Sequence, residues 1–142
     1  MSERHCESCS LCCKLLAVPD VTEKGVWCRH ARPGSGCGCA IYKERPEPCR
    51  DFHCLWLVDQ KWGDYWRPDK CRIVIEIKVG GGAGERGEVG AICFHVDPDY
   101  PTRWQDEPWH SDILTIARAG REGRQGKTWA TIVMINSRPI VI

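Results

Sequence analysis

Hydrophobic and polar residues alternate most clearly in the second half of the chain. Residues 72–79 read Arg-Ile-Val-Ile-Glu-Ile-Lys-Val, and residues 91–96 read Ala-Ile-Cys-Phe-His-Val. Both segments are rich in β-branched side chains, which predicts two strands that pair antiparallel. Residues 128–135 and 138–142 predict a second hairpin that turns at residues 136–137.

Apolar residues recur at helical spacing over residues 107–119. Asp106 is the expected N-cap of this helix, and Gly120 is expected just past its last residue. Shorter helices are predicted over residues 7–16 and 48–58. The buried stripe of the long helix is expected to consist of Trp109, Ile113, Ile116 and Ala117.

These elements predict an α+β fold, and the 142 residues fit one domain. Residues 59–142 are expected to form a small, mostly antiparallel sheet of about four strands with one helix packed on it. Residues 1–58 are rich in Cys, Pro and charge, so burial alone cannot offset their chain entropy. We therefore expect a Cys-rich, metal-stabilised region with short helices, packed on the second region within one compact domain.

The first of these regions holds nine of the eleven cysteines. Four of them form the run Cys6-x-x-Cys9-x-x-Cys12-Cys13. A helix over residues 7–16 would place Cys6, Cys9 and Cys13 on one face, where thiolates can converge on a soft metal ion. The other five cysteines of this region are Cys28, Cys37, Cys39, Cys49 and Cys54.

The first residues, Met-Ser-Glu-Arg-His-Cys, have no apolar stretch behind them, and no later run approaches the ~18 residues of a membrane-spanning helix. We therefore expect a cytoplasmic protein without a signal peptide. Because the cytosol keeps thiols reduced, eleven cysteines there indicate metal ligands or redox thiols more than disulfides. Disulfides stay open only for a protein exported by another route.

The charges nearly cancel, since 20 basic and 19 acidic side chains leave a net charge of +1. This balance favours neither nucleic acid nor an anionic membrane as a partner. The seven tryptophans are accordingly expected to serve packing, because a platform for nucleic-acid bases needs basic residues gathered around it. Metal ions are the expected partners. A protein partner stays open, with the loop 80–90 and the edge strand 138–142 as candidate surfaces.

Two glycine-containing segments imitate nucleotide-binding motifs. Residues 82–87 match G-x-G-x-x-G, but a strand follows them, so they lack the helix N-terminus that a pyrophosphate needs. Gly126-Lys127-Thr128 lacks the earlier glycine of a phosphate-binding loop, because position 121 is arginine. Both segments are interpreted as loops.

Several other residues are given structural roles. His5, His30 and His53 each neighbour a cysteine, and surface imidazoles are favoured there over metal ligands. Cys71 and Cys93 flank the first predicted hairpin and are expected to be buried, inert thiols, although they could face each other and pair under oxidation.

Enzymatic activity is left open, because no pair of base and nucleophile is evident outside the cysteine cluster. Asp97, Asp99 and Asp106 lie near the end of the second predicted strand. Isolated acids in a loop are usually solvated, so these three are expected at the surface.

A second sequence motif follows the run of cysteines that begins at Cys6. Trp27-Cys28 is followed by Cys39 and then by Tyr-x-x-Arg-Pro-x-x-Cys-Arg-x-Phe-x-Cys over residues 42–54. Together with the run at Cys6, this pattern resembles the CxxCxxCC family of zinc- or iron-chelating domains, also called YkgJ-type cysteine-cluster proteins. The matching residues span 6–54, a little over a third of the chain.

The resemblance implies a set of metal ligands. Eight positions carry over, with Cys37 as a ninth candidate: Cys6, Cys9, Cys12, Cys13, Cys28, Cys39, Cys49 and Cys54. Eight thiolates suit two zinc ions, or one [4Fe–4S] cluster plus one zinc, and nine could fill a three-zinc cluster. Arg45 and Arg50 are candidates to offset the negative charge of such a centre, and Tyr42 lies beside them in the motif.

Two functions follow as expectations. The first is a metal-binding protein that chelates zinc or an iron–sulfur centre, with more than one metal ion. The alternative is a redox or modification-enzyme component that uses a [4Fe–4S] cluster for electron transfer or assists protein methylation. The methylation link is an analogy, because a domain related to this family occurs in flagellin lysine methylases.

Overall fold

The computed structural model describes residues 11–15, 25–31, 54–79, 90–136 and 138–142, together with residues 41, 44, 47 and 49. For Cys12, Cys13 and Val79 it describes the backbone alone. The elements are, in order, α1 (Cys12–Leu15), α3 (Leu55–Val58), the 3-10 turn η2 (Asp64–Trp66), α4 (Pro68–Cys71), β1 (Ile73–Val79), β2 (Gly90–Val96), the 3-10 turn η3 (Arg103–Gln105), α5 (Trp109–Glu122), β3 (Ala130–Ile135) and β4 (Arg138–Val141).

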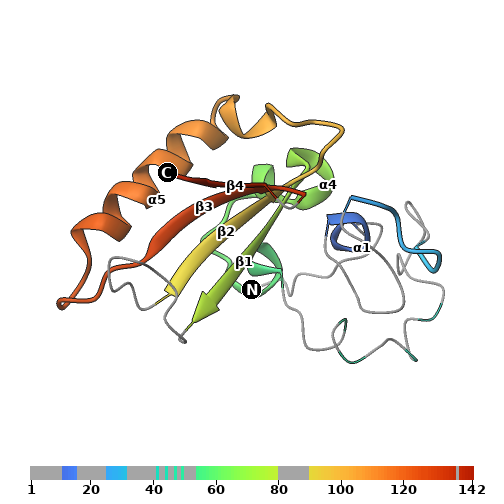
Figure 1. Ribbon diagram of the computed structural model, residues 1–142, viewed down its shortest axis with the longest axis horizontal. Coiled ribbons are helices and arrows are strands. Elements are labelled where there is room, and N and C mark those ends of the chain that lie inside the picture. The colour runs from blue at the N-terminus through green and yellow to red at the C-terminus, as the bar shows by residue number, and fades with distance from the viewer. Residues whose placement is uncertain are drawn as a thin grey trace.

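The described strands form a mixed sheet in the order β1-β2-β3-β4. β1 and β2 are antiparallel, as are β3 and β4, whereas β2 and β3 run parallel. The parallel pair needs a crossover connection, and α5 provides it. Figure 1 shows α5 along one side of the sheet and α1 on the opposite side of the view. The predicted α+β fold with four strands, mostly antiparallel, is confirmed.

The main core lies on the face of the sheet that meets α5. Ile75 of β1 lies opposite Phe94 of β2, which lies opposite Val133 of β3, and all three side chains are fully buried. Ile113 of α5 is equally buried. Trp66 adds an aromatic contact, with its ring centroid 5.5 Å from that of Phe94.

The long helix exists as predicted, but its two ends differ from the expectation. α5 begins at Trp109 and continues through Gly120 to Glu122, where Gly123 ends it with a φ of 74°. Gly120 serves packing instead, because a Cβ atom there would lie 2.7 Å from the backbone oxygen of Trp129. At the start, Asp106 contributes only its backbone oxygen, which accepts a hydrogen bond from the His110 amide at 2.9 Å.

The structure describes only part of one predicted short helix and shows a break in the other. Cys12–Leu15 is the described part of the helix expected at 7–16. The helix expected over 48–58 is interrupted, because Cys54 has an extended backbone with φ −62° and ψ 129°, and α3 begins only after it. This conformation accompanies the burial of the Cys54 side chain in the core.

The segment around Gly126 is a turn between α5 and β3, closed by backbone hydrogen bonds between Arg124 and Lys127. This confirms its interpretation as a loop. Residues 82–87 lie outside the described residues, but strand β2 follows them, as expected. In the described part of the chain, no helix has both the length and the apolar character needed to cross a membrane.

Candidate metal centre

Helix α1, which carries Cys12 and Cys13, is fixed on the body of the protein. Leu11 and Leu15 are 2% and 4% exposed and belong to the same hydrophobic core as the strands β1 and β2. Residues 11 and 15 are four apart, so they share one face of the helical turn. The backbone that bears the two cysteines therefore has a defined position relative to the sheet.

Lys14 lies on the same buried side and is only 4% exposed. Its Nζ atom is 2.8 Å from Oδ1 of Asp97, which follows β2 directly and is fully buried. Lys14 also bonds Oδ2 of Asp99 at 2.5 Å. Arg72 completes the network, since its Nε and Nη2 atoms donate to Oδ2 of Asp97 at 3.1 and 2.7 Å.

This network keeps Lys14 and Asp97 charged. Burial opposes the charge on Asp97, but hydrogen bonds from Lys14, the Asp99 amide and Arg72 outweigh it and lower the pKa of Asp97. Burial likewise opposes the charge on Lys14, and the two aspartates outweigh it and raise the pKa of Lys14. A buried lysine is thus neutralised by two aspartates that follow β2, and Arg72, just before β1, shares the Asp97 carboxylate.

The segment 25–31, which carries Cys28, lies beside α1. The Gly25 amide donates to the backbone oxygen of Lys14 at 2.7 Å. The Lys14 ammonium lies 5.7 Å from the ring centroid of Trp27, the residue before Cys28. Figure 1 shows α1 and the light blue segment 25–31 as neighbours. Two cysteine-bearing segments that are separated in the sequence by residues 16–24 therefore meet at Lys14.

Cys28 is a half-buried thiol. Its Sγ atom accepts a hydrogen bond from the His30 amide at 3.4 Å. Amide-to-sulfur hydrogen bonds also occur around the sulfur ligands of iron–sulfur centres. The imidazole Nε2 of His30 accepts a bond from Arg29 at 3.3 Å, so that nitrogen is engaged with a neighbouring side chain.

Cys49 and Cys54 are also thiols, half-buried and buried respectively. Cys54 belongs to the core cluster that contains Leu11 and Leu15 of α1. The donor chemistry of these residues and Cys28 fits a metal that prefers thiolate ligands.

Most of the predicted centre lies outside the described residues. Among the residues that the structure describes, no three Cys, His, Asp or Glu side chains form a group that could hold a metal ion. Cys28, Cys49 and Cys54 therefore do not make such a group by themselves. The predicted site residues beyond the described part are Cys6, Cys9, Cys37, Cys39, Tyr42, Arg45 and Arg50, together with the side chains of Cys12 and Cys13.

Cys71 and Cys93 are buried, as expected, with 0% and 1% of their surface exposed. The thiol of Cys71 donates to the backbone oxygens of Trp66 and Ile73. The idea that Cys71 and Cys93 face each other is wrong, because the register pairs Cys93 with Glu76, five residues along the chain from Cys71. Cys71 itself lies in α4, before β1 begins, and so outside the paired residues of the two strands.

Sequence reasoning missed the ion network and misjudged Asp97. Asp99 and Asp106 are exposed as expected, with 73% and 61% of their side chains accessible. Asp97 is fully buried because Lys14 and Arg72 neutralise it there. One feature of the sequence could have indicated the ion network. Lys14 lies three residues after Leu11 and one before Leu15, on an apolar helical face where a lysine needs a buried partner.

No protein-family model, curated protein or solved structure matches this chain. The resemblance of residues 6–54 to the CxxCxxCC family therefore stays a prediction from the residues.

Proposed function

We propose that the protein binds metal through its N-terminal cysteine cluster, as zinc or as an iron–sulfur centre, and holds more than one metal ion. Bound zinc would stabilise the fold, and an iron–sulfur cluster would carry electrons. The proposed ligands are those of the sequence pattern between Cys6 and Cys54. A reducing compartment such as the cytoplasm suits this chemistry, because it keeps the ligands as thiols.

The observation that carries the proposal is the convergence at Lys14. The backbone bond from Gly25 and the contact with Trp27 bring the Cys28 segment against the helix of Cys12 and Cys13. A shared centre requires this proximity, because its ligands come from separate segments. Ligands on a fixed backbone also lose less freedom when the metal binds.

In this proposal Lys14 holds helix α1 in position and does not offset the charge of the metal centre. Its ammonium is already bonded to Asp97 and Asp99, so its charge is satisfied on the side of the sheet. An anionic thiolate cluster still needs offsetting donors. The proposal gives this task to Arg45 and Arg50 and to amides such as that of His30.

The test compares a cysteine that is predicted to bind metal with a cysteine that is not. Cys28→Ser is expected to lower the metal content per chain of anaerobically purified protein, because serine is a poor ligand for soft metals. Cys71→Ser is the matched control, since a serine hydroxyl can donate to the same two backbone oxygens. The proposal for Cys28 fails if both variants keep the wild-type metal content.

A further inference from the structure

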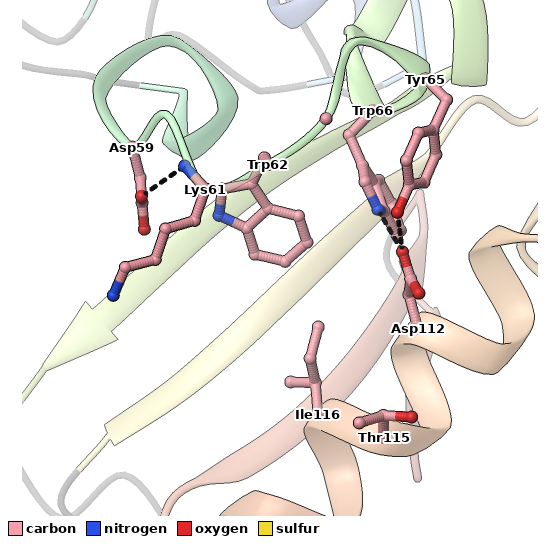
Figure 2. Close-up of a pocket in the computed structure, with 9 residues that line it drawn as sticks. Asp59, Lys61, Trp62, Tyr65, Trp66, Asp112, Thr115 and Ile116 are labelled. Atoms are coloured by element: carbon pink, nitrogen blue, oxygen red, sulfur yellow. Dashed lines mark hydrogen bonds between the residues drawn. The ribbon is translucent and has the colours of Figure 1, made fainter.

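A cavity of about 300 Å³ lies between residues 59–66 and helix α5. Figure 2 shows its walls, with Trp62, Tyr65 and Trp66 on one side and Asp112 and Ile116 of α5 on the other. The rings of Trp62 and Trp66 are nearly perpendicular, at 83°, with centroids 5.2 Å apart. The three aromatic side chains thus line one side of the cavity and face the Asp112 carboxylate.

Two hydrogen bonds hold the Asp112 carboxylate in place beside these rings. Oδ2 of Asp112 accepts hydrogen bonds from the Tyr65 hydroxyl at 2.6 Å and the Trp66 indole at 2.9 Å. Both donors are neutral, and Oδ1 of Asp112 takes no hydrogen bond from the described residues. The Asp112 carboxylate also raises the pKa of Tyr65, through the hydrogen bond first of all. Asp59 brings a second carboxylate to the rim.

A second cavity of about 370 Å³ adjoins the first, and the two share Asp59, Trp62 and Ile116 as lining residues. Its other walls are mainly apolar, and they include Leu55, Ile77, Ile92 and Trp129, with Lys78 as the charged residue among them. An aromatic, negatively charged chamber thus opens beside an apolar one.

We propose that the two cavities together bind an organic cation, a quaternary ammonium group with an alkyl tail. The ammonium group would lie against Trp62 and Tyr65 and beside Asp112, because ring faces and carboxylates both attract a weakly hydrated cation. Trp66 is only 1% exposed, so its indole holds the Asp112 carboxylate in place and does not itself contact the ligand. The tail would lie between Ile77, Ile92 and Trp129, where it leaves water. This inference is independent of the proposed metal function.

Lys61 also lines the aromatic cavity, and it gives the proposal a further consequence. In Figure 2 its ammonium group points away from Asp112. Its positive charge still opposes a second cation nearby. Lys61→Gln is therefore expected to tighten binding of the cation, which a general loss of structure would not do.

The experiment is a titration of the full-length protein, followed by the NMR signals of the tryptophan indole N–H groups. The probes are choline, its uncharged carbon isostere dimethylbutanol, and hexyltrimethylammonium. Choline is expected to bind about tenfold more tightly than the isostere, which corresponds to one cation–π and carboxylate contact. Hexyltrimethylammonium is expected to bind more tightly than choline, because its tail reaches the apolar cavity.

Variants locate the site. Asp112→Asn keeps an oxygen that can accept the bonds of Tyr65 and Trp66, and it is expected to reduce the preference for choline over the isostere, because only the aromatic contact with the cation remains. Asp64→Asn, an exposed neighbour outside the cavity lining, is the matched control and is expected to keep that preference. Ile77→Ala is expected to reduce the advantage of the hexyl tail, with the exposed Leu114→Ala as its control.

Equal binding of choline and its isostere to the wild-type protein would overturn the proposal. So would the absence of any saturable shift at tens of millimolar probe, and both results are independent of how the variants fold. A preference for choline that is undiminished in Asp112→Asn would place the cation elsewhere and would also overturn it.

Discussion

Lys14 is the residue that joins the cysteine-bearing helix α1 to the α+β region. Its side chain crosses from α1 to Asp97, and Arg72 bonds the other oxygen of the same carboxylate. Removing one partner of a buried ion pair leaves the other charge uncompensated. This lowers the stability of the fold far more than the loss of a surface ion pair does. Burial of this kind depends on partners distant in sequence, so the sequence around Asp97 alone predicted a solvated acid.

At the residue scale, Asp97→Asn is expected to lower the free energy of unfolding by about 3 kcal/mol at neutral pH. The loss lies at the low end for a buried pair, because Lys14 still bonds Asp99 and the Arg72 side chain is 24% exposed. Denaturant unfolding measures this difference. Asp106→Asn, at an exposed acid, is the control and should change stability by less than about 0.5 kcal/mol.

The same variant gives a pH dependence with a defined sign. The pKa of Asp97 is lowered in the folded protein, so its contribution is complete above its unfolded pKa of about 3.9 and disappears as the pH falls through the lower folded value. The stability difference between wild type and Asp97→Asn should therefore shrink below about pH 4. A difference that stays constant down to acid pH would contradict the ion pair.

At the scale of elements, the sequence predicted the strands better than the ends of the helix. Strand periodicity is local, and the β1–β2 and β3–β4 hairpins follow from it directly. The end of α5 is set by tertiary contact, because Gly120 is helical and packs against Trp129 while Gly123 supplies the positive φ. A glycine that allows close approach and one that ends a helix look identical in sequence.

Gly120→Ala tests this assignment. Alanine in the middle of a helix normally stabilises it by about 1 kcal/mol relative to glycine. Here the new Cβ would lie 2.7 Å from the Trp129 backbone oxygen, so we expect a net destabilisation of about 1–3 kcal/mol in thermal or denaturant unfolding. Arg118→Ala, at an exposed position of α5, should be nearly neutral. A Gly120→Ala protein more stable than wild type would show that Gly120 is not packed as described.

At the scale of the whole molecule, the two predicted regions, 1–58 and 59–142, contribute to one hydrophobic core. Leu11, Leu15, Cys54 and Trp56 belong to the same cluster as the buried residues of β1 and β2. The sequence predicted the α+β region from its own periodicity. The arrangement of the cysteines could not be predicted in the same way, because it depends on ligands from separate segments and on a metal whose identity the thiols leave open.

The central claim is that the cysteine cluster between Cys6 and Cys54 holds more than one metal ion. The most direct measurement is the metal and sulfide content of the protein purified without oxygen, together with its visible spectrum. We predict either a colourless protein with two or three zinc ions per chain, or a brown protein with stoichiometric iron and sulfide. A metal-free protein whose cysteines are joined in native disulfides would contradict the claim.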